Sequence, residues 1–442
     1  MKIAVIGSGI SGLSAAWLLS RTHDVTLYEQ GAHVGGHSNT VDVAMPEGQV
    51  PVDTGFIVYN ERNYPNLTAL FRHLAVPTAS TRMSFALSAG DGRYEYSGSL
   101  AGFFGQPGNL FDRDHWRLLA EILRFFREAS RDDALCESPL GLGAAMAAAG
   151  YSRRFIEEHL LPMGAAIWST PADRMLHYPV AAFLRFYRNH GLTRLVGRPR
   201  WRTVIGGSRE YVRRLLADSR IVLRLETPVR EVARRGAAVE VLDGHGGRQR
   251  YDQVVVAAHA DQALSILADA DDVERELLSA FPYQRNHAVL HTDVRLMPRR
   301  RRLWASWNYI KTGAGAETGL CVSYWMNSLQ PLATRTDIFV TLNPPAMPDA
   351  AHVLGSFVYH HPVFDARSMA ARARLWQLQG RRRTWFCGAY FGDGFHEDGI
   401  QSGLAVAEQL GGLRRPWTVA AESGRIAVTP PLTGGPVPEP AE

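Results

Sequence analysis

The chain has 442 residues, of which 46% are apolar and 21% charged, and its formal net charge is +5. This composition is typical of a folded globular protein and excludes an intrinsically disordered one, and no apolar run is long enough to cross a bilayer. A strand expected from Lys2 leaves no room for a signal peptide, so we expect a cytoplasmic protein. The cysteines, Cys136, Cys321 and Cys387, have neither disulfide nor metal-ligand spacing, so no metal site is predicted.

The first forty residues predict a strand, a glycine-rich turn, a helix and a second strand that ends at an acidic residue. The turn and helix start read Gly7-Ser8-Gly9-Ile10-Ser11-Gly12, and the second strand leads into Glu29 and Gln30. In a dinucleotide-binding fold such glycines allow a tight turn, close approach of a diphosphate and tight helix packing. The helix N-terminus at Ile10 and Ser11 would then face the diphosphate. Glu29 can bind a ribose 2′-hydroxyl and would repel a 2′-phosphate, which favours NAD or FAD over NADP.

A glycine doublet follows this unit, and it suggests which dinucleotide binds. Gly35-Gly36-His37 comes six residues after Glu29, and Asp53-Thr54-Gly55 comes after an expected hairpin. The doublet resembles the second fingerprint of the FAD-dependent amine oxidase superfamily, which includes protoporphyrinogen oxidases and carotenoid desaturases. His37 stands where that superfamily usually has an arginine. The resemblance implies FAD, and because Cys387 precedes the cofactor loop we expect non-covalent binding.

The middle of the chain is predicted to be helical and rich in aromatic residues. Helices are expected over 67–74, 114–130, 153–161 and 180–189, with a short strand over 84–87. Most of these aromatic side chains should pack in the core, and a minority should line an apolar pocket. A further helix around 211–216 and strands over 221–225, 227–233, 238–242 and 251–259 then return the chain to the first domain. In the resembled superfamily, a backbone group of the residue matching Val229 meets the adenine.

The carboxy-terminal motif is the third element of the resemblance. It is expected as a strand over 385–389, a loop over 392–399 and a helix over 400–410. In relatives the loop places an acidic residue on the ribityl chain, and the helix N-terminus faces the flavin N1 and O2 edge, where a reduced flavin carries negative charge. The cofactor residues implied here are Gly388, Asp393, Glu397, Asp398, Gly399 and Ile400.

These motifs imply an α/β protein. It should have a discontinuous Rossmann-like FAD-binding domain (GR2-type) formed by residues 1–58, 201–280 and 384–412. The interleaved α+β substrate domain would comprise residues 59–200 and 281–383, with helices and a mixed or antiparallel sheet. Two aromatic strands around Trp307 and Tyr324, joined by a turn at Gly313 to Gly315, suggest a sheet face that covers the flavin or the substrate. Residues 413–442 form a proline-containing tail that we expect to be partly disordered.

Three histidines are candidates for a catalytic base, since imidazole titrates near neutral pH. His396 lies in the expected flavin loop. His287 and His291 share one face of a strand expected over 285–295, while Asn286, Ala288 and Leu290 share the other. A loose alignment places His287 where amine oxidases carry a lysine facing flavin N5. All three histidines could equally be structural.

The function favoured by these features is hydride transfer from a hydrophobic substrate, either a small molecule or a lipid acyl chain, to FAD. Within the superfamily the chain looks most similar to bacterial predicted NAD/FAD-binding oxidoreductases associated with lipid modification beside cyclopropane-synthase-like methyltransferases, so a lipid methyltransferase is a candidate partner. An amine oxidase, a polyene desaturase or isomerase, and a flavin-binding scaffold without turnover remain alternatives.

Two arginine clusters bear on further partners. The first is Arg299 to Arg302, and the second comprises Arg372, Arg374 and Arg381 to Arg383. Solvated turns are the simpler interpretation. The more specific interpretation is peripheral contact with an anionic membrane, which requires both clusters to lie on one face of the protein. No recognised nucleic-acid motif accompanies them, so nucleic-acid binding is not predicted.

Overall fold

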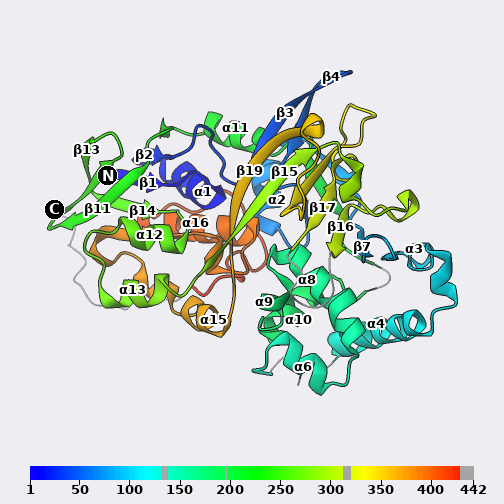
Figure 1. The fold of residues 1–442 in the computed structure, drawn as a ribbon. Helices are drawn as coiled ribbons and strands as arrows, with labels where there is room; N and C mark the ends of the chain where they lie inside the picture. Colours follow the sequence, from blue (N-terminus) through cyan, green and yellow to red (C-terminus); the bar gives the residue numbers. More distant parts are fainter. Residues whose placement is uncertain (132–134, 136–137, 195–196, 312–319, 429–442) are drawn as a thin grey trace. The chain divides into compact units, whose positions relative to one another are not determined.

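The computed structural model describes residues 1–131, 135, 138–194, 197–311 and 320–428 (Figure 1). Cys136, the turn at Gly313 to Gly315 and the last fourteen positions, 429–442, lie outside this described part. The chain forms two compact units, each built from separate segments. Unit 1 consists of Met1–Val34, Ser219–Phe281 and Arg367–Glu442, and unit 2 of Gly35–Asp218 and Pro282–Ala366.

Unit 1 is a parallel five-stranded sheet with helices, as the first motif predicts. Its strand order is β10-β2-β1-β14-β20, and every neighbouring pair is parallel. The central strands are continuous apolar runs because a parallel sheet is covered on both faces. The sheet strands are β1 (Lys2–Ile6), β2 (Asp24–Tyr28), β10 (Val222–Arg224), β14 (Gln253–Val256) and β20 (Thr384–Phe386).

The rest of unit 1 consists of helices and an antiparallel three-stranded sheet. Figure 1 shows α1 beside β1 and β2. The helices are α1 (Ile10–Leu19), α12 (Ala260–Ile266), α13 (Asp272–Leu278) and α16 (His396–Gly411), with α15 (Ala366–Arg372) at the junction between the units. The small sheet contains β11 (Val229–Arg235), β12 (Ala238–Asp243) and β13 (Arg248–Tyr251).

Unit 2 is built on a mixed seven-stranded sheet in the order β19-β15-β18-β17-β16-β7-β8. All neighbours are antiparallel except β16 and β7, which are parallel. This confirms the predicted mixed sheet. The strands are β7 (Phe85–Ala89), β8 (Tyr94–Ser97), β15 (Tyr283–His291), β16 (Trp307–Lys311), β17 (Val322–Trp325), β18 (Phe339–Leu342) and β19 (Val353–Pro362).

Two small sheets and a group of helices complete unit 2. The hairpin pairs β3 (Thr40–Met45) with β4 (Gly48–Asp53), and the other sheet joins β5 (Tyr59–Asn60), β6 (Thr78–Thr81) and β9 (Trp201–Val204). The helices are α2 (Pro65–His73), α3 (Leu100–Phe103), α4 (Arg113–Arg131), α6 (Leu142–Ala148), α7 (Arg153–Phe155), α8 (Leu161–Trp168), α9 (Ala172–Met175), α10 (Val180–Asn189), α11 (Arg209–Ala217) and α14 (Met326–Leu329). A π-helical turn, Ile156–Leu160, links α7 to α8.

Several predicted element boundaries are wrong. The strand expected over 385–389 ends at Phe386, and the helix expected over 153–161 continues through a π-helical turn to Trp168. The strand expected over 251–259 is two strands, because β13 pairs with β12 while β14 pairs with β1. The strand expected over 285–295 ends at His291, since the Asp293 carboxylate then caps a 3₁₀ turn, Val294–Leu296. The loop expected over 392–399 ends at Phe395, where α16 begins. The Asp398 carboxylate accepts a hydrogen bond from the Phe395 N–H at 2.8 Å, which closes the first helical turn.

The predicted domain boundary after residue 58 differs from the division between the compact units, which follows Val34. The hairpin β3–β4 belongs to unit 2 because Asp53 at its end bonds Ser208 and Gln330, both in unit 2. In the described part of the chain, no helix has the length and apolar character needed to span a bilayer.

Candidate functional site

The three glycines at the turn after β1 and in the first part of α1 have different environments. Gly7 has φ +101°, and a Cβ atom there would lie 2.7 Å from the carbonyl oxygen of Ala257. A Cβ atom at Gly12 would lie 1.9 Å from the carbonyl oxygen of Gly7, whereas one at Gly9 would meet nothing within 4 Å. Gly7 and Gly12 are therefore required by backbone packing inside unit 1, while Gly9 faces open space.

That open space lies at the N-terminus of α1. Gly9 is the N-cap and offers no side-chain acceptor to the first-turn N–H groups near Ile10 and Ser11. A helix N-terminus with an open approach is suited to bind a diphosphate. The turn thus fits the dinucleotide that the sequence predicts.

Glu29 lies directly after β2, and its carboxylate is held toward this turn. One oxygen accepts hydrogen bonds from the Ser8 hydroxyl at 2.6 Å and the Ser8 N–H at 3.1 Å, and the other accepts the Gly31 N–H at 2.8 Å. Each carboxylate oxygen has further acceptor capacity, so the group can still bind a ribose hydroxyl. Gln30 is exposed, and Val229 is half-buried at the start of β11.

Helices α16 and α1 pack side by side through glycines. A Cβ atom at Gly399 would lie 2.7 Å from the Ile10 side chain, and one at Gly403 would lie 2.2 Å from the carbonyl oxygen of Ser11. The contacts advance along both helices in the same direction, so the helices are parallel and their N-termini lie at the same end. Two helix dipoles therefore present positive ends together, which favours anionic groups of a cofactor. Ile400, the next residue, is fully buried.

Acidic residues at the start of α16 are engaged by arginines. Asp393 pairs with Arg372 at 2.6 Å, and Asp398 pairs with Arg425 at 2.7 Å. Burial raises the pKa of Asp398 to about 7, and Arg425 opposes that rise. Gly388 donates its N–H to Ser402 at 3.0 Å, and the buried Glu397 accepts from Gln401 at 2.9 Å. The acidic groups predicted to meet the ribityl chain thus already have protein partners.

Arg372 and Arg425 are site residues that sequence reasoning missed. Arg372 was noted only for its charge, and Arg425 falls in the tail expected to be partly disordered. The described beginning of that tail packs on unit 1, since Trp417 stacks on Trp17 with ring centroids 5.7 Å apart. Arg415 is buried and bonds Glu408 at 2.7 Å. No local pattern in the sequence indicates that Arg372 pairs with Asp393 or that Arg425 pairs with Asp398.

His396 is the first residue of α16. Burial lowers its pKa to about 3, so the imidazole is neutral at ordinary pH. In the unfolded chain this imidazole has a pKa of about 6.5. Between about pH 6.5 and about pH 3 only the unfolded chain binds the proton, so the free energy of unfolding falls as the pH drops through this range and is unaffected by this group above it.

We therefore expect that His396→Gln, which stays uncharged, will lessen the acid-induced loss of stability by on the order of 1 kcal/mol. The measurement is the free energy of urea unfolding at about pH 4.5 and about pH 7.5. His245→Gln, at an exposed histidine of the same unit, is the control for the loss of an imidazole. Equal pH slopes for the wild type and His396→Gln would contradict this account.

In unit 2, the Gly35-Gly36 doublet makes a tight turn that leads to His37. Gly35 and Gly36 have φ +123° and +58°, and a Cβ atom at Gly55 would lie 2.2 Å from the carbonyl oxygen of His37. The His37 ring lies 5.1 Å, centroid to centroid, from each of Tyr359 and His361. The residue that departs from the superfamily pattern is therefore packed among aromatic rings.

Asp53 is fully buried, and its carboxylate is surrounded by donors of unit 2. It accepts hydrogen bonds from Thr40 at 2.6 Å, from the Ser208 N–H and hydroxyl at 2.8 Å each, and from Gln330 at 2.8 Å. Burial raises the pKa of Asp53 to about 6, and these donors oppose the rise. Thr54 beside it bonds the Tyr359 hydroxyl at 2.6 Å.

The two faces of the seven-stranded sheet differ in chemistry. Asn286 pairs with Tyr359 across β15 and β19, so both lie on one face, which we call the Tyr359 face. Its apolar and amide residues include Asn286, Ala288, Leu290, Phe357, Tyr359, Leu342, Val340, Val322, Tyr324, Trp307 and Tyr309. Gln284, His361 and Lys311 lie at the ends of its strands on the same face, and Lys311 pairs with Glu157 at 3.5 Å. His287 and His291 lie on the opposite face, as the predicted alternation requires. Asn286, rather than His287, therefore shares a face with Tyr359.

His291 and His287 are both hydrogen-bonded on that opposite face. His291 accepts the Asp293 N–H at Nδ1, so Nε2 carries the proton and bonds Thr341 at 2.7 Å. Burial lowers the pKa of His291 to about 4. His287 Nε2 bonds the Ser356 hydroxyl at 2.6 Å. Protein groups thus engage both ring nitrogens of His291 and the Nε2 atom of His287.

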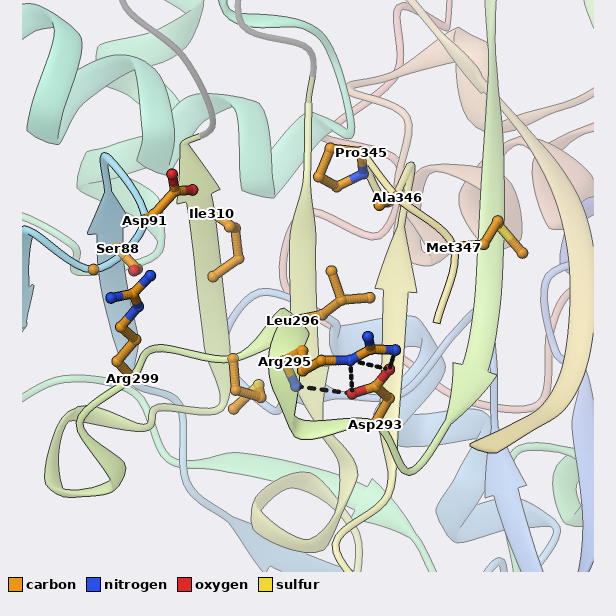
Figure 2. A pocket seen from close by; sticks show the side chains of 12 residues that line it. Ser88, Asp91, Asp293, Arg295, Leu296, Arg299, Ile310, Pro345, Ala346 and Met347 are labelled. Carbon is orange, nitrogen blue, oxygen red and sulfur yellow. Dashed lines mark hydrogen bonds and ion pairs between the residues drawn. The ribbon is translucent and has the colours of Figure 1, made fainter. Parts of the chain in front are cut away.

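A pocket of about 330 Å³ opens near one end of the sheet (Figure 2). Figure 2 shows the ion pair between Arg295 and Asp293, which are 2.6 Å apart, and the exposed Arg299 beside Ser88. Apolar side chains of Leu296, Ile310 and Met347 line it as well. Ile310 is adjacent in β16 to Tyr309, so the pocket includes residues of the face opposite the Tyr359 face.

The parallel sheet, the glycine turn and the paired helix N-termini define a dinucleotide-binding protein. The family model for flavin-containing amine oxidoreductases matches residues 10–293. The chain belongs to this family of FAD-dependent oxidoreductases, and FAD is its cofactor. No curated protein matches the sequence.

Solved structures share the fold over nearly the whole chain. A protein proposed to be a protoporphyrinogen oxidase, from Exiguobacterium sp. 255-15, has a TM-score of 0.64 at 15% identity and covers 93% of this chain and 98% of its own. A CLA-producing fatty acid isomerase from P. acnes has a TM-score of 0.63 at 15% identity, and the match covers 92% of this chain and 97% of the isomerase. A putrescine oxidase bound to putrescine has a TM-score of 0.63 at 13% identity, and the match covers 93% of this chain and 99% of the oxidase.

Proposed function

We propose that this flavoenzyme removes a hydride from an apolar substrate of the lipid acyl-chain class. The observation that carries the proposal is the composition of the Tyr359 face, which is aromatic and aliphatic over its central strands. Among the described strands of the seven-stranded sheet, Glu95 is the only acidic residue, and it lies on the opposite face. A hydrocarbon chain is stabilised by such a surface because its transfer from water is favourable.

The side chains of this face can hold a substrate in place with few polar contacts. Trp307 and Phe357 are half-buried and supply apolar surface, which also excludes water. Tyr359 is fixed by Asn39 at 3.0 Å and by Thr54, and burial raises its pKa, so the phenol is neutral. FAD, when bound, supplies the hydride-accepting chemistry. The protein contributes orientation and a dry environment.

Amine oxidation is the second candidate. The aromatic residues of the Tyr359 face could surround a cation, and one structural neighbour is a putrescine oxidase. Another neighbour is a fatty acid isomerase. Since all of these proteins share one fold at low identity, the fold alone does not choose between amines and acyl chains.

Anaerobic mixing separates these candidates. Purified holoenzyme is mixed with total membrane lipid or with a panel of amines, and the flavin absorbance is followed. Bleaching with lipid supports the proposal, and bleaching with amines alone overturns it. A flavin that neither class reduces points to the scaffold alternative, or to a polyene isomerase if polyene substrates are converted without net bleaching.

A matched pair of variants tests whether the Tyr359 face binds the substrate. Phe357→Asp places a carboxylate on this face, whereas Val358→Asp places one on the opposite face at the next residue of β19, where Val358 is 42% exposed. Because a charge beside a hydrocarbon must be desolvated, we expect Phe357→Asp to slow flavin reduction by lipid at least about tenfold. Val358→Asp should leave the rate unchanged. Similar rates for the two variants would place the substrate elsewhere.

A further inference from the structure

Apolar side chains are unusually exposed along α3, the 3₁₀ turn η1 (Pro107–Leu110) and α4. Phe111 is 88% exposed, Leu100 74% and Trp116 49%. Leu110 and Leu123 are 48% and 43% exposed. A concentration of large exposed apolar groups in one region marks an interaction surface.

Two contacts of Trp116 join the three segments that carry these side chains. The Trp116 indole donates a hydrogen bond to the carbonyl oxygen of Leu110 at 3.0 Å, and its ring lies 4.7 Å from that of Phe104. Leu100 and Phe104 are four residues apart at α3, and Leu123 lies two helical turns after Trp116 on α4. We call this set the α3–α4 surface.

Arginines flank the apolar groups. The exposed residues of α4 include Arg113, Arg117 and Arg127 and a single acid, Asp114, which lies 4.0 Å from Arg154. In the described part of the chain, Arg113 and Arg127 have no carboxylate within ion-pair distance. Their charge is therefore available to an anionic partner.

The first arginine cluster adjoins the same surface. Leu303, in the turn η4 (Arg301–Leu303), packs against Gly105, where an added Cβ would lie 2.3 Å from its side chain. This contact brings the exposed Arg302 next to the α3 segment. In the second cluster, Arg372, Arg374, Arg381 and Arg382 are bonded to Asp393, Glu276, Asp271 and Asp269 respectively. In the first cluster, Arg300 and Arg301 are also paired, with Glu95 at 2.7 Å and Asp337 at 2.8 Å, so the membrane interpretation rests on the exposed Arg299 and Arg302.

The α3–α4 surface is held rigidly to the sheet. Gln106 accepts the Glu95 N–H at 2.8 Å and donates to the Arg93 carbonyl at 2.7 Å, and Asn109 donates to the Glu95 carbonyl at 3.0 Å. The buried Glu95 carboxylate also bonds the Arg299 N–H and the Arg300 guanidinium, each at 2.7 Å. One buried residue thus fixes the apolar segment and the arginine cluster together, so little ordering is needed on binding.

We propose that the α3–α4 surface docks the protein on an anionic lipid bilayer. Phe, Trp and Leu side chains insert at the interface, while flanking arginines bind the head groups, as in interfacial amphipathic segments. The free arginines favour a bilayer over a second copy of the same surface, which would bring like charges together. Docking is independent of which substrate the flavin oxidises.

The test is co-sedimentation of the holoenzyme with vesicles of phosphatidylcholine alone or with about a third of phosphatidylglycerol. The wild type should bind the anionic vesicles, and binding should weaken as salt is raised. The double variant Leu110→Ser with Phe111→Ser should bind about tenfold or more weakly, because two inserted side chains are lost. The control Ile205→Ser removes an apolar side chain of unit 2 that is 44% exposed and lies outside the α3–α4 surface, and it should bind normally.

The charge contribution has its own pair of variants. Arg113→Ala with Arg127→Ala should lower binding to the anionic vesicles several-fold, whereas Arg62→Ala, at another exposed arginine, should not. Unchanged flavin absorbance shows that each variant is folded. Equal binding to both vesicle types, no vesicle binding, or concentration-dependent dimerisation abolished by the Leu110 and Phe111 changes would each overturn the proposal. Vesicle binding is measured without turnover, so a protein that does not bind vesicles can still reduce its flavin with lipid, and the two proposals can fail independently.

Discussion

Gly12→Ala is expected to destabilise unit 1 by about 3 kcal/mol or more and to abolish FAD retention. The new methyl group would sit 1.9 Å from the carbonyl oxygen of Gly7 and 3.0 Å from the Ala257 side chain. Backbone atoms cannot yield as a flexible side chain can, so α1 must move away from β1. The measurements are thermal unfolding of the apoprotein and the flavin-to-protein absorbance ratio after purification.

Gly9→Ala is the matched control, because it adds the same methyl group three residues earlier, in open space. We expect the apoprotein to unfold at the wild-type temperature while the affinity for FAD falls, since the methyl group obstructs the approach to the N-terminus of α1. If both variants lost the same stability, Gly12 would not be the residue that packing requires, and Gly9 would not serve only the approach of the cofactor.

Asp53→Ala is expected to destabilise unit 2 by about 3 kcal/mol. Removing the carboxylate leaves buried donors of Thr40, Ser208 and Gln330 without their acceptor. These three residues join the hairpin, the start of α11 and the end of α14, so the loss affects three segments. Urea unfolding followed by tryptophan fluorescence measures the effect.

The control is Asp42→Ala in the same hairpin. Asp42 pairs with Arg209 at 2.6 Å, but both side chains are more than 40% exposed. A surface ion pair contributes little because water screens it, so a change below about 1 kcal/mol is expected. If Asp53→Ala were as mild as Asp42→Ala, Asp53 would not be the organising carboxylate of this region.

Local sequence patterns predicted the parts of the site that depend on near neighbours. The turn of Gly7, Gly9 and Gly12 and the acid Glu29 belong to one strand–helix–strand unit, so their spacing carries the information. The alternation of His287 and Asn286 was also predicted, because it needs only the strand period. Which of the two shares a face with Tyr359 depends on the pairing of β15 with β19, which are distant in sequence.

The start of α16 shows why part of the site could not be predicted. Gly394 and Gly399 suggest a loop, and Gly394 does have φ +93°. Gly399, however, is helical and is needed because α1 lies against it. A glycine selected for close helix packing looks the same in sequence as one selected for a turn. The partnership of Asp398 with Arg425 is equally invisible, since it depends on how the chain returns after α16.

The parallel packing of α1 and α16 determines when the cofactor can be taken up during synthesis. α1 emerges from the ribosome first, while β20 and α16 are among the last described elements to emerge. Domains fold as their segments are completed, and the edge of the sheet at β14 stays unpaired until β20, which follows it by more than a hundred residues, has been translated. We therefore expect a chain that ends before β20 to retain the first glycine fingerprint but to lack the last strand of the sheet and the second helix dipole, and to bind FAD weakly.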